Sequence, residues 1–570
     1  MNYSRSMLLI RPKVSFKSKL FLRLSSTKTV TPKSKPKSVS KWFIPGTVVG
    51  LLSGWFGANY YLRSNPPDDV FPLSATTPIS SLTQTPKYAT PDQVKSAVEE
   101  IKQFLKPDQF TDSPSELHIH SDNSSNFHKP NDDERPYLIT YPETTEEVQA
   151  IVKICYKYNV PMVPYSGGTS IEGHFIPTRK GISIDVIRMS KVLALHEDDL
   201  DVVIQPGVGW QELGEYLEPH GLLFGPDPGP GACIGGMVAT NCSGTRATRY
   251  GTMKDNVIAL KVVLSDGTLI KTKNRPRKSS AGYNLTGLFV GSEGTLGIIV
   301  EATLKLSVLP EEEVIAIVNF NTIKEAAKTV TDLFKAGISV NAVELMDDRQ
   351  MRCIKEMEEK NGFSSRKWSD KNLLLFKIGG SKSSLKDQIN SVKKISSKNG
   401  GFNVEIAKDE NEKQLIWNAR KTQLWTSIEW AKQKIPNARS WPTDVAVPIS
   451  NFPKVIAETA EDIENHGLMT TVVGHAGDGN IHALVIFPPE KLSVAEEVVH
   501  NMVKRAIANE GTVSGEHGVG IGKREFLEQE LGVEAVDAMR RIKLSLDPKS
   551  LLNPDKIFKT DPNESRIDNY

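Results

Sequence analysis

Two histidines in the C-terminal part of the chain have the residue type and spacing of metal ligands. Residues 469–487 read as two strands around an Ala-Gly-Asp-Gly turn. If residues 476–479 form a four-residue hairpin loop, His475 and His482 lie on one sheet face as diagonal neighbours, within reach of a shared ion. A histidine on a strand is usually structural, so the pattern leaves a structural role and a metal site equally open.

A Glu-His pair follows in the glycine-rich segment 511–522, GTVSGEHGVGIG. Neighbouring residues of a regular strand point to opposite faces, whereas a glycine-rich turn lets Glu516 and His517 aim at one centre. Glu516 would complete a site of two histidines and one glutamate with open positions for a substrate. His517 would then be free to act as a base. The alternative is that the pair caps the N-terminus of a helix.

Three glycine-rich segments in the first half could hold a large, flat ligand. In the first, 164–170 (PYSGGTS), paired glycines and hydroxyls could hold a pyrophosphate, although such a sequence is more often only a turn. It matches neither a Walker loop nor the G-x-G-x-x-G fingerprint. The second, 225–252, holds too many small residues for an ordinary apolar core. The third, 291–299, predicts a turn followed by a strand.

The elements around these segments indicate a mixed architecture. From Arg135 onward, short β-branched runs alternate with helical ones, as in an α+β nucleotide-binding domain. Helices are predicted from Pro91 and from Thr144, the latter with Glu146 and Glu147 at the positive end of its dipole.

The N-terminus has the composition of a targeting segment. Residues 1–41 are rich in Arg, Lys and Ser and contain no acid, which is typical of a mitochondrial transit peptide. A nucleic-acid-binding arm is the alternative, but no nucleic-acid-binding module follows. Residues 42–62 carry no charge and are long enough to form a transmembrane helix, although several glycines and a proline also allow a segment that does not insert. Residues 63–134 are expected to form a linker and an N-terminal helical segment.

Charge and cysteine spacing narrow the function classes. The chain has a net charge of +2, and because its first 67 residues hold only basic charges, the remainder is net acidic. The four cysteines form no C-x-x-C pair, so the sequence gives no case for a zinc knuckle, a redox dithiol or an attached c-type haem.

The three glycine-rich segments together resemble the FAD-binding half of the vanillyl-alcohol-oxidase-type flavoproteins. The resemblance implies that the first loop binds the FAD pyrophosphate and that the other two line the cofactor. Several members attach the flavin to a histidine in the first loop, so Thr169 at this place implies non-covalent FAD, and His174 is expected to be structural. The residues expected to bind FAD are Ser166, Gly167, Gly168, Thr169, Ser170, Pro226, Gly235, Gly236, Thr240, Asn241, Gly244, Gly251, Val257, Gly294 and Ile298.

The histidine and Glu-His motifs resemble the C-terminal domain of FAD-linked oxidases, among them D-lactate and D-2-hydroxyglutarate dehydrogenases. The shared motifs are Gly-His-x-Gly-Asp-Gly-Asn-x-His and Gly-Glu-His-Gly. The resemblance implies that His475, His482 and Glu516 bind a divalent metal, Zn or Mn, and that His517 is the catalytic base. It also implies that Arg420 grips the substrate carboxylate. The expected division is an FAD-binding domain at 135–311 and an α+β substrate and metal domain with an antiparallel sheet at 312–560.

The same resemblance implies metal-assisted hydride transfer from a small D-2-hydroxy acid to the flavin. Taken whole, the chain resembles the fungal mitochondrial branch of the family that oxidises D-lactate and reduces cytochrome c. The positive charge of residues 1–41 favours the matrix side of the apolar segment, so we expect a single-pass protein of the inner mitochondrial membrane with its catalytic domain in the intermembrane space. Pro442 stands where the hydroxyglutarate enzymes are expected to carry a second lysine, which disfavours a dicarboxylate. The alternatives are a D-2-hydroxyglutarate dehydrogenase and a flavin- or metal-binding scaffold without turnover.

One position departs from the family pattern. Asp555 stands where glycine is common in the C-terminal Asn-Pro-Gly motif. Aspartate tolerates a left-handed backbone better than most residues, so we expect little functional consequence.

Overall fold

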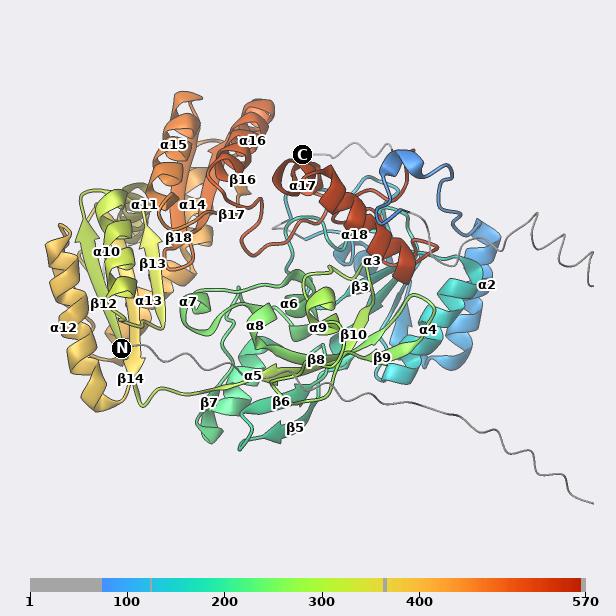
Figure 1. Ribbon diagram of the computed structural model, residues 1–570. Coiled ribbons are helices and arrows are strands. Elements are labelled where there is room, and N and C mark those ends of the chain that lie inside the picture. The colour runs from blue at the N-terminus through green and yellow to red at the C-terminus, as the bar shows by residue number, and fades with distance from the viewer. Residues whose placement is uncertain (1–73, 124–125, 362–365, 565–570) are drawn as a thin grey trace, which may run out of the picture. The chain divides into compact units, whose positions relative to one another are not determined.

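The computed structural model describes residues 74–123, 126–361 and 366–564, which belong to one compact unit. They combine helices with mostly antiparallel sheets, which confirms the predicted α+β class (Figure 1). None of the helices in these ranges is long and apolar enough to cross a membrane. The predicted targeting segment 1–41 and membrane segment 42–62 lie outside the described residues.

A small sheet positions the first glycine-rich loop. Its strands, in spatial order, are β1 (Phe110–Thr111), β2 (Leu138–Thr140), β4 (Ile182–Asp185) and β3 (Met162–Tyr165). The last three run parallel, so the loop that starts at Ser166 leaves the carboxyl end of β3. Helices α2 (Pro91–Phe104) and α4 (Thr145–Tyr158) bury their apolar faces in the core beside this sheet. Thr144 caps α4 with a capping box, as the sequence predicts.

A five-stranded antiparallel sheet positions the other two glycine-rich segments. Its order is β5 (Val192–His196), β6 (Asp201–Ile204), β10 (Ile298–Lys305), β8 (Val257–Val263) and β9 (Leu269–Lys271). The third segment leads directly into β10. The second contributes two short helices, α6 (Ile234–Thr240) and α7 (Ala247–Tyr250), and α8 (Met253–Asn256) follows it directly. This half also contains α3 (Pro114–Ile119), α5 (Trp210–Leu217), α9 (Leu285–Phe289) and the strand pair β7 (Leu222–Leu223) and β11 (Ser307–Val308).

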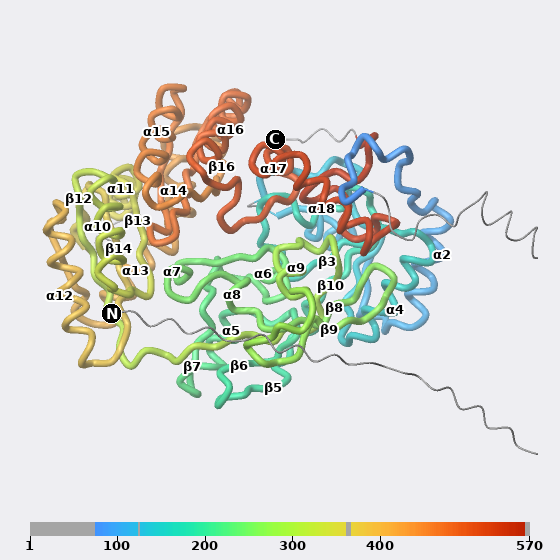
Figure 2. Tube along the Cα trace, viewed as in Figure 1, coloured from blue at the N-terminus to red at the C-terminus, as the bar shows by residue number. Residues whose placement is uncertain are grey.

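An eight-stranded antiparallel sheet forms the second half. Its order is β15 (Phe402–Ile406), β12 (Glu312–Phe320), β14 (Asn372–Gly380), β13 (Ala342–Met346), β18 (Met469–His475), β19 (Asn480–Phe487) and β16 (Arg439–Pro442), and β17 (Val445–Ala446) also pairs with β19. One face packs against α10 (Ile323–Lys335), α12 (Lys382–Lys398), α15 (Phe452–Asn465) and α16 (Leu492–Ala508). The opposite face packs against α11 (Asp348–Asn361), α13 (Glu410–Lys421) and α14 (Gln423–Lys434). The tube in Figure 2 follows the chain through this helix-covered sheet.

The C-terminal helices α17 (Arg524–Leu531) and α18 (Val533–Leu546) lead the chain back to the first half. After α18, Leu551 and Leu552 enter the core that α2 and α4 share. The backbone N–H of Met162 donates to the carbonyl of Leu551, and the backbone N–H of Asn553 donates to the carbonyl of Met162. The C-terminal segment thus holds β3 on the edge that does not pair with β4. The predicted domain division at residues 311 and 312 therefore stays a proposal. The segment after α18 belongs to the second domain in that division, but it packs with the FAD-binding half.

Asp555 has the expected left-handed backbone, with φ of 66°. Its carboxylate has a structural role that the sequence does not reveal. It is 2% exposed, accepts a hydrogen bond of 2.7 Å from Nε of Arg179, and accepts another of 2.9 Å from the hydroxyl of Thr178. Arg179 also pairs with Asp561 at 3.1 Å.

Asp555→Gly is expected to destabilise the protein even though glycine suits the backbone. Breaking a buried ion pair costs about 3–5 kcal/mol, and relief of the left-handed strain returns about 1 kcal/mol. Because Arg179 keeps Asp561, the net loss should be roughly 2 kcal/mol in the free energy of unfolding measured by denaturant titration. Lys180→Gly is the control, since Lys180 has φ of 57° and no buried carboxylate to lose. Equal effects of the two substitutions would contradict this role of Asp555.

Candidate active site

The predicted hairpin forms with the predicted register. His475 pairs with Asn480 and His482 pairs with Val473, so both imidazoles lie on the sheet face that α11, α13 and α14 cover. Their ring centroids are 5.4 Å apart. Glu344 on β13 is directly opposite His475 in the next strand pair and shares this face. Three polar side chains therefore stand on one rigid surface.

Glu516 reaches the same place from the glycine-rich loop. Its Oε1 lies 3.4 Å from Nε2 of His475 and 3.3 Å from Nε2 of His482. Its Oε2 accepts hydrogen bonds from the Ser243 hydroxyl at 2.8 Å and from the Gly244 backbone N–H at 2.9 Å. The structure thus brings together the three predicted metal ligands, and Glu516 does not cap a helix, because α17 begins only at Arg524.

The donor set fits a divalent metal ion. One ligand atom from each of His475, His482 and Glu516 can be chosen so that all lie within 4.8 Å of one another. The remaining ring nitrogens already have acceptors: Nδ1 of His475 lies 2.8 Å from Glu344, and Nδ1 of His482 lies 3.1 Å from the Thr443 carbonyl. Such acceptors fix each ring with Nε2 turned to the metal position.

The buried groups His475 and Glu516 each shift the pKa of the other. Burial alone would lower the pKa of His475, but the facing carboxylates of Glu344 and Glu516 raise it well above its ordinary value. Burial would raise the pKa of Glu516, and His475 and His482 instead hold it well below its ordinary value. Both shifts have the same cause, the close approach of buried imidazole and carboxylate groups.

Asp444 anchors the loop that carries Glu516 and His517. Its buried carboxylate accepts the backbone N–H of both residues at 3.0 Å, the hydroxyl of Ser514 at 2.7 Å and an ion pair from Lys523 at 3.3 Å. With His482 and His517, Asp444 forms a second group of potential metal ligands. Because these donors occupy Oδ2 and Nδ2 of Asn480 donates to Oδ1 at 2.7 Å, we assign Asp444 to holding the loop.

His517 lies between the three potential metal ligands and two buried acids, Glu172 and Asp444. Its ring stacks on His482 with centroids 5.2 Å apart, and its Nδ1 is 3.8 Å from Glu172 and 4.0 Å from Asp444. Burial lowers the pKa of His517, while Asp444 and Glu172 more than offset this and raise it. Glu172 is fixed in turn by Lys523 at 3.2 Å. The two acids thus lie near enough to stabilise a protonated His517, but neither is within hydrogen-bond distance of its Nδ1.

Arg420 extends from α13 to the same sheet face. It is 7% exposed, and its Nη2 donates to Oε2 of Glu344 at 2.7 Å. Its Nε is buried without a hydrogen-bond partner among the described residues. Arg420 therefore keeps donors for a ligand, as expected of a residue that binds a carboxylate.

One cavity of about 810 Å³ joins these groups to the glycine-rich loops. Its wall includes His475, His482, Glu516, His517 and Arg420. The predicted FAD residues that line it are Ser166, Gly167, Gly168, Thr169, Ser170, Gly235, Gly236, Thr240, Gly244, Gly294 and Ile298. The others, Pro226, Asn241, Gly251 and Val257, do not line it. Asn241 instead accepts hydrogen bonds from Thr252 and Lys254, so its place is structural in this conformation.

The first loop fits the phosphates of a dinucleotide. Within the described chain, the backbone N–H groups of residues 166–170 donate to no protein acceptor. Backbone donors in folded proteins are nearly always paired with protein, water or ligand, and consecutive donors of this kind bind anions. His174 is held by Ser170 at 2.8 Å and by Glu293 at 3.2 Å, which agrees with its expected structural role.

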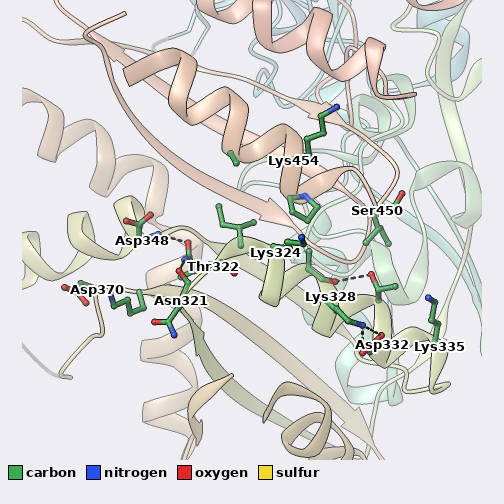
Figure 3. A pocket seen from close by; sticks show the side chains of 18 of the residues that line it. Asn321, Thr322, Lys324, Lys328, Asp332, Lys335, Asp348, Asp370, Ser450 and Lys454 are labelled. Atoms are coloured by element: carbon green, nitrogen blue, oxygen red, sulfur yellow. Dashed lines mark hydrogen bonds and ion pairs between the residues drawn. The ribbon is translucent and has the colours of Figure 1, made fainter. Parts of the chain in front are cut away.

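A second cavity, of about 820 Å³, is a poor candidate for the chemistry (Figure 3). It lies beside α10 and α15 and shares no lining residue with the first cavity. Its wall has no histidine, cysteine or glycine, and several of its charges pair with each other, such as Lys328 with Asp332 at 3.0 Å and Arg352 with Asp348 at 2.6 Å. Of these two cavities, only the first is lined by the predicted catalytic residues and the glycine-rich loops.

Two protein-family models match successive segments of the chain. Residues 136–273 match the family model of an FAD binding domain, and residues 309–557 match that of the FAD linked oxidases, C-terminal domain. The chain is 46% identical over 579 residues to "D-lactate dehydrogenase (cytochrome) 1, mitochondrial" of Saccharomyces cerevisiae, covering 98% of each chain. It is 50% identical over 486 residues to "D-lactate dehydrogenase (cytochrome), mitochondrial" of Kluyveromyces lactis, covering 84% of each.

Solved structures of low sequence identity share the fold. A 4-ethylphenol oxidase from Gulosibacter chungangensis aligns with a TM-score of 0.68 at 17% identity, over 84% of this chain and 99% of its own. A p-cresol methylhydroxylase aligns with a TM-score of 0.67 at 16% identity, over 85% of this chain and 100% of its own. The likeness confirms the vanillyl-alcohol-oxidase type of fold.

Proposed function

Because the chain belongs to the family of FAD-linked oxidases, we propose that it is an FAD-dependent dehydrogenase that oxidises D-lactate to pyruvate and passes the electrons to cytochrome c. The names of the yeast relatives, at 46% and 50% identity, support this substrate and this acceptor. The structural observation that carries the proposal is the single cavity in which the flavin loops meet His517, Arg420 and the three potential metal ligands.

The residues of the cavity divide the work on a 2-hydroxy acid. Arg420 binds the carboxylate through the donors that Glu344 leaves free. His517 accepts the proton of the 2-hydroxyl group, and Asp444 and Glu172 stabilise the imidazolium that results. FAD, when bound, accepts the hydride from C2. Removing a proton and a hydride from C2–OH gives the ketone of pyruvate.

The metal and the non-covalent state of FAD belong to the same proposal. His475, His482 and Glu516 would hold a Zn or Mn ion. Such an ion supplies a Lewis acid for the hydroxyl oxygen and lowers the pKa of that group. Thr169 lines the cavity where related flavoproteins carry an attachment histidine, which supports dissociable FAD.

The cavity wall supports a monocarboxylate. Pro442 lines the cavity beside Leu484 and Leu424, so the position where a second lysine is expected in hydroxyglutarate enzymes is apolar. Burial of a second carboxylate there without a cation would be unfavourable. D-2-Hydroxyglutarate dehydrogenase therefore stays the alternative substrate assignment. A scaffold without turnover is disfavoured because base, arginine and potential metal ligands line one cavity.

The purified protein is expected to show a flavin spectrum that bleaches when D-lactate is added under anaerobic conditions. D-2-Hydroxyglutarate should bleach it much more slowly because the wall at Pro442, Leu484 and Leu424 carries no charge to bind a second carboxylate. Acid precipitation should release the FAD into the supernatant. A spectrum unchanged by D-lactate would falsify the proposed reaction, and flavin that stays with the precipitate would contradict non-covalent binding.

Removal of a bound metal is expected to slow flavin reduction strongly while FAD stays bound. Chelator-treated protein should recover with Zn²⁺ or Mn²⁺, and His475→Ala or Glu516→Ala should resemble the chelated state, because each removes one potential ligand. His466→Ala is the matched control, since His466 caps α15 away from the cavity lining. Full activity in protein that elemental analysis finds metal-free would contradict this part of the proposal.

His517→Ala is expected to lower the rate of flavin reduction by about 10²–10⁴-fold, the usual contribution of a general base. The Kd of D-lactate should change less, because Arg420 still binds the carboxylate. Stopped-flow reduction over a range of D-lactate concentrations separates the two quantities. Reduction at the wild-type rate would mean that another group takes the proton.

We further place the protein in mitochondria, which the names of its relatives support. The finer proposal is a single span at 42–62 with the catalytic domain in the intermembrane space, where soluble cytochrome c is available. The net acidic charge after residue 67 suits a strongly basic partner.

Reduction of cytochrome c is therefore expected to slow as ionic strength rises, with little change in flavin reduction by D-lactate, because salt screens long-range attraction. Protease added to mitochondria with a ruptured outer membrane should digest the catalytic domain. Protection until the inner membrane is lysed would place the domain in the matrix and exclude direct transfer to cytochrome c.

A further inference from the structure

Glu344 joins two groups that have separate tasks in the proposed reaction. Its carboxylate is 0% exposed and lies on β13. Oε1 is 2.8 Å from Nδ1 of His475, a potential metal ligand, and Oε2 is 2.7 Å from Nη2 of Arg420. A single buried carboxylate thus contacts both the imidazole of the metal site and the guanidinium that faces the substrate cavity.

The contact to His475 is fixed by the sheet. Glu344 and His475 are directly opposite residues of the β13–β18 pair, and both point to the face that α13 covers. The Cβ atoms of such a cross-strand pair are about 5 Å apart, so the sheet keeps the two side chains close to each other. Because Glu344 accepts a hydrogen bond from Nδ1 of His475, Nε2 of that ring points towards Glu516.

The contact to Arg420 crosses from the sheet to a helix. Arg420 stands in the last turn of α13, where its side chain is buried with no second carboxylate partner among the described residues. Its Nε has no hydrogen-bond partner there, and the residue lines the cavity. Glu344 therefore determines which donors of Arg420 are occupied and which remain for a ligand.

We propose that Glu344 is a positioning residue that fixes Arg420 and His475 relative to each other. Arg420 can then bind the carboxylate of a 2-hydroxy acid while the metal site binds the hydroxyl group of the same molecule. This inference rests on the proposed function. Glu344 itself does not touch the substrate. The substrate feature that this coupling selects is a carboxylate attached directly to the hydroxyl-bearing carbon.

Glu344→Gln tests the coupling because the amide keeps the shape but loses the charge that holds both partners. In metal-saturated protein, kcat/KM for D-lactate is expected to fall by about 10–100-fold. D-Lactamide, whose neutral amide gains little from Arg420, should be affected much less. The ratio of kcat/KM for D-lactate to that for D-lactamide is therefore expected to fall about tenfold or more. A merely structural defect would lower both values together and leave the ratio unchanged.

A second readout needs no turnover. Titration of metal-free protein with Zn²⁺ should give a Kd about 10–100-fold higher for Glu344→Gln, because outer-shell acceptors of ligating histidines contribute about that factor. Asp347→Asn is the matched control: Asp347 is equally buried and follows the same strand, but it binds the backbone of Gln350 and Val472 instead of His475 or Arg420. This control should leave both the substrate ratio and the Zn²⁺ affinity as in the wild type.

The outcomes separate the two proposals. If wild-type protein is not reduced by D-lactate, the proposed function fails. If it is reduced but Glu344→Gln keeps the wild-type substrate ratio and Zn²⁺ affinity, the positioning role of Glu344 is overturned alone. Should Glu344→Gln not retain FAD, Glu344→Asp replaces it, because the shorter side chain cannot reach both partners. The same loss of ratio is expected for that variant, and an unchanged ratio would again overturn the proposal.

Discussion

The active site depends on the compensation of carboxylates that are buried away from water. Glu344, Asp444 and Glu172 are at most 3% exposed, and each lies against a cation or a set of hydrogen-bond donors. An isolated buried charge is so unfavourable that each acid restricts its partners to a few positions. Arg420 and Lys523 are held in this way, and Glu344 also orients the imidazole of His475. The catalytic geometry thus follows from where the buried acids are.

The same requirement joins the two halves of the chain. Oε2 of Glu516 accepts hydrogen bonds from the second glycine-rich segment, and Glu293 of the third segment accepts the backbone N–H groups of Val519 and Gly520 at 2.7 and 2.8 Å. The catalytic loop is therefore held against the flavin loops at both of its sides. The proposed base and the proposed flavin site lie on different segments and would need such a connection, because small misplacements of reacting groups slow a reaction greatly.

Much of the site can be predicted from the sequence, because its ligands lie in short motifs whose spacing has direct geometric meaning. The four-residue hairpin fixes which faces His475 and His482 occupy, and the register is as expected. Glu344 and Asp444 carry no such signal. Glu344 lies in an apolar strand, and its role follows from pairing with a strand more than one hundred residues away. Contacts of this kind are set by sheet order, which local patterns do not encode.

The Gly-Glu-His-Gly motif has a steric explanation in these contacts. A Cβ on Gly515 would lie 1.9 Å from the amide of Asn480 and 2.8 Å from the carboxylate of Asp444, so a larger residue would push the loop off its anchor. Gly518 has φ of 84°, a conformation that L-residues with side chains avoid. The glycines let the backbone approach Asp444 closely enough for its carboxylate to accept the N–H of both Glu516 and His517. Glu516 and His517 are therefore directed to one centre, because the small residues around them let the carboxylate of Asp444 bind their backbone N–H groups.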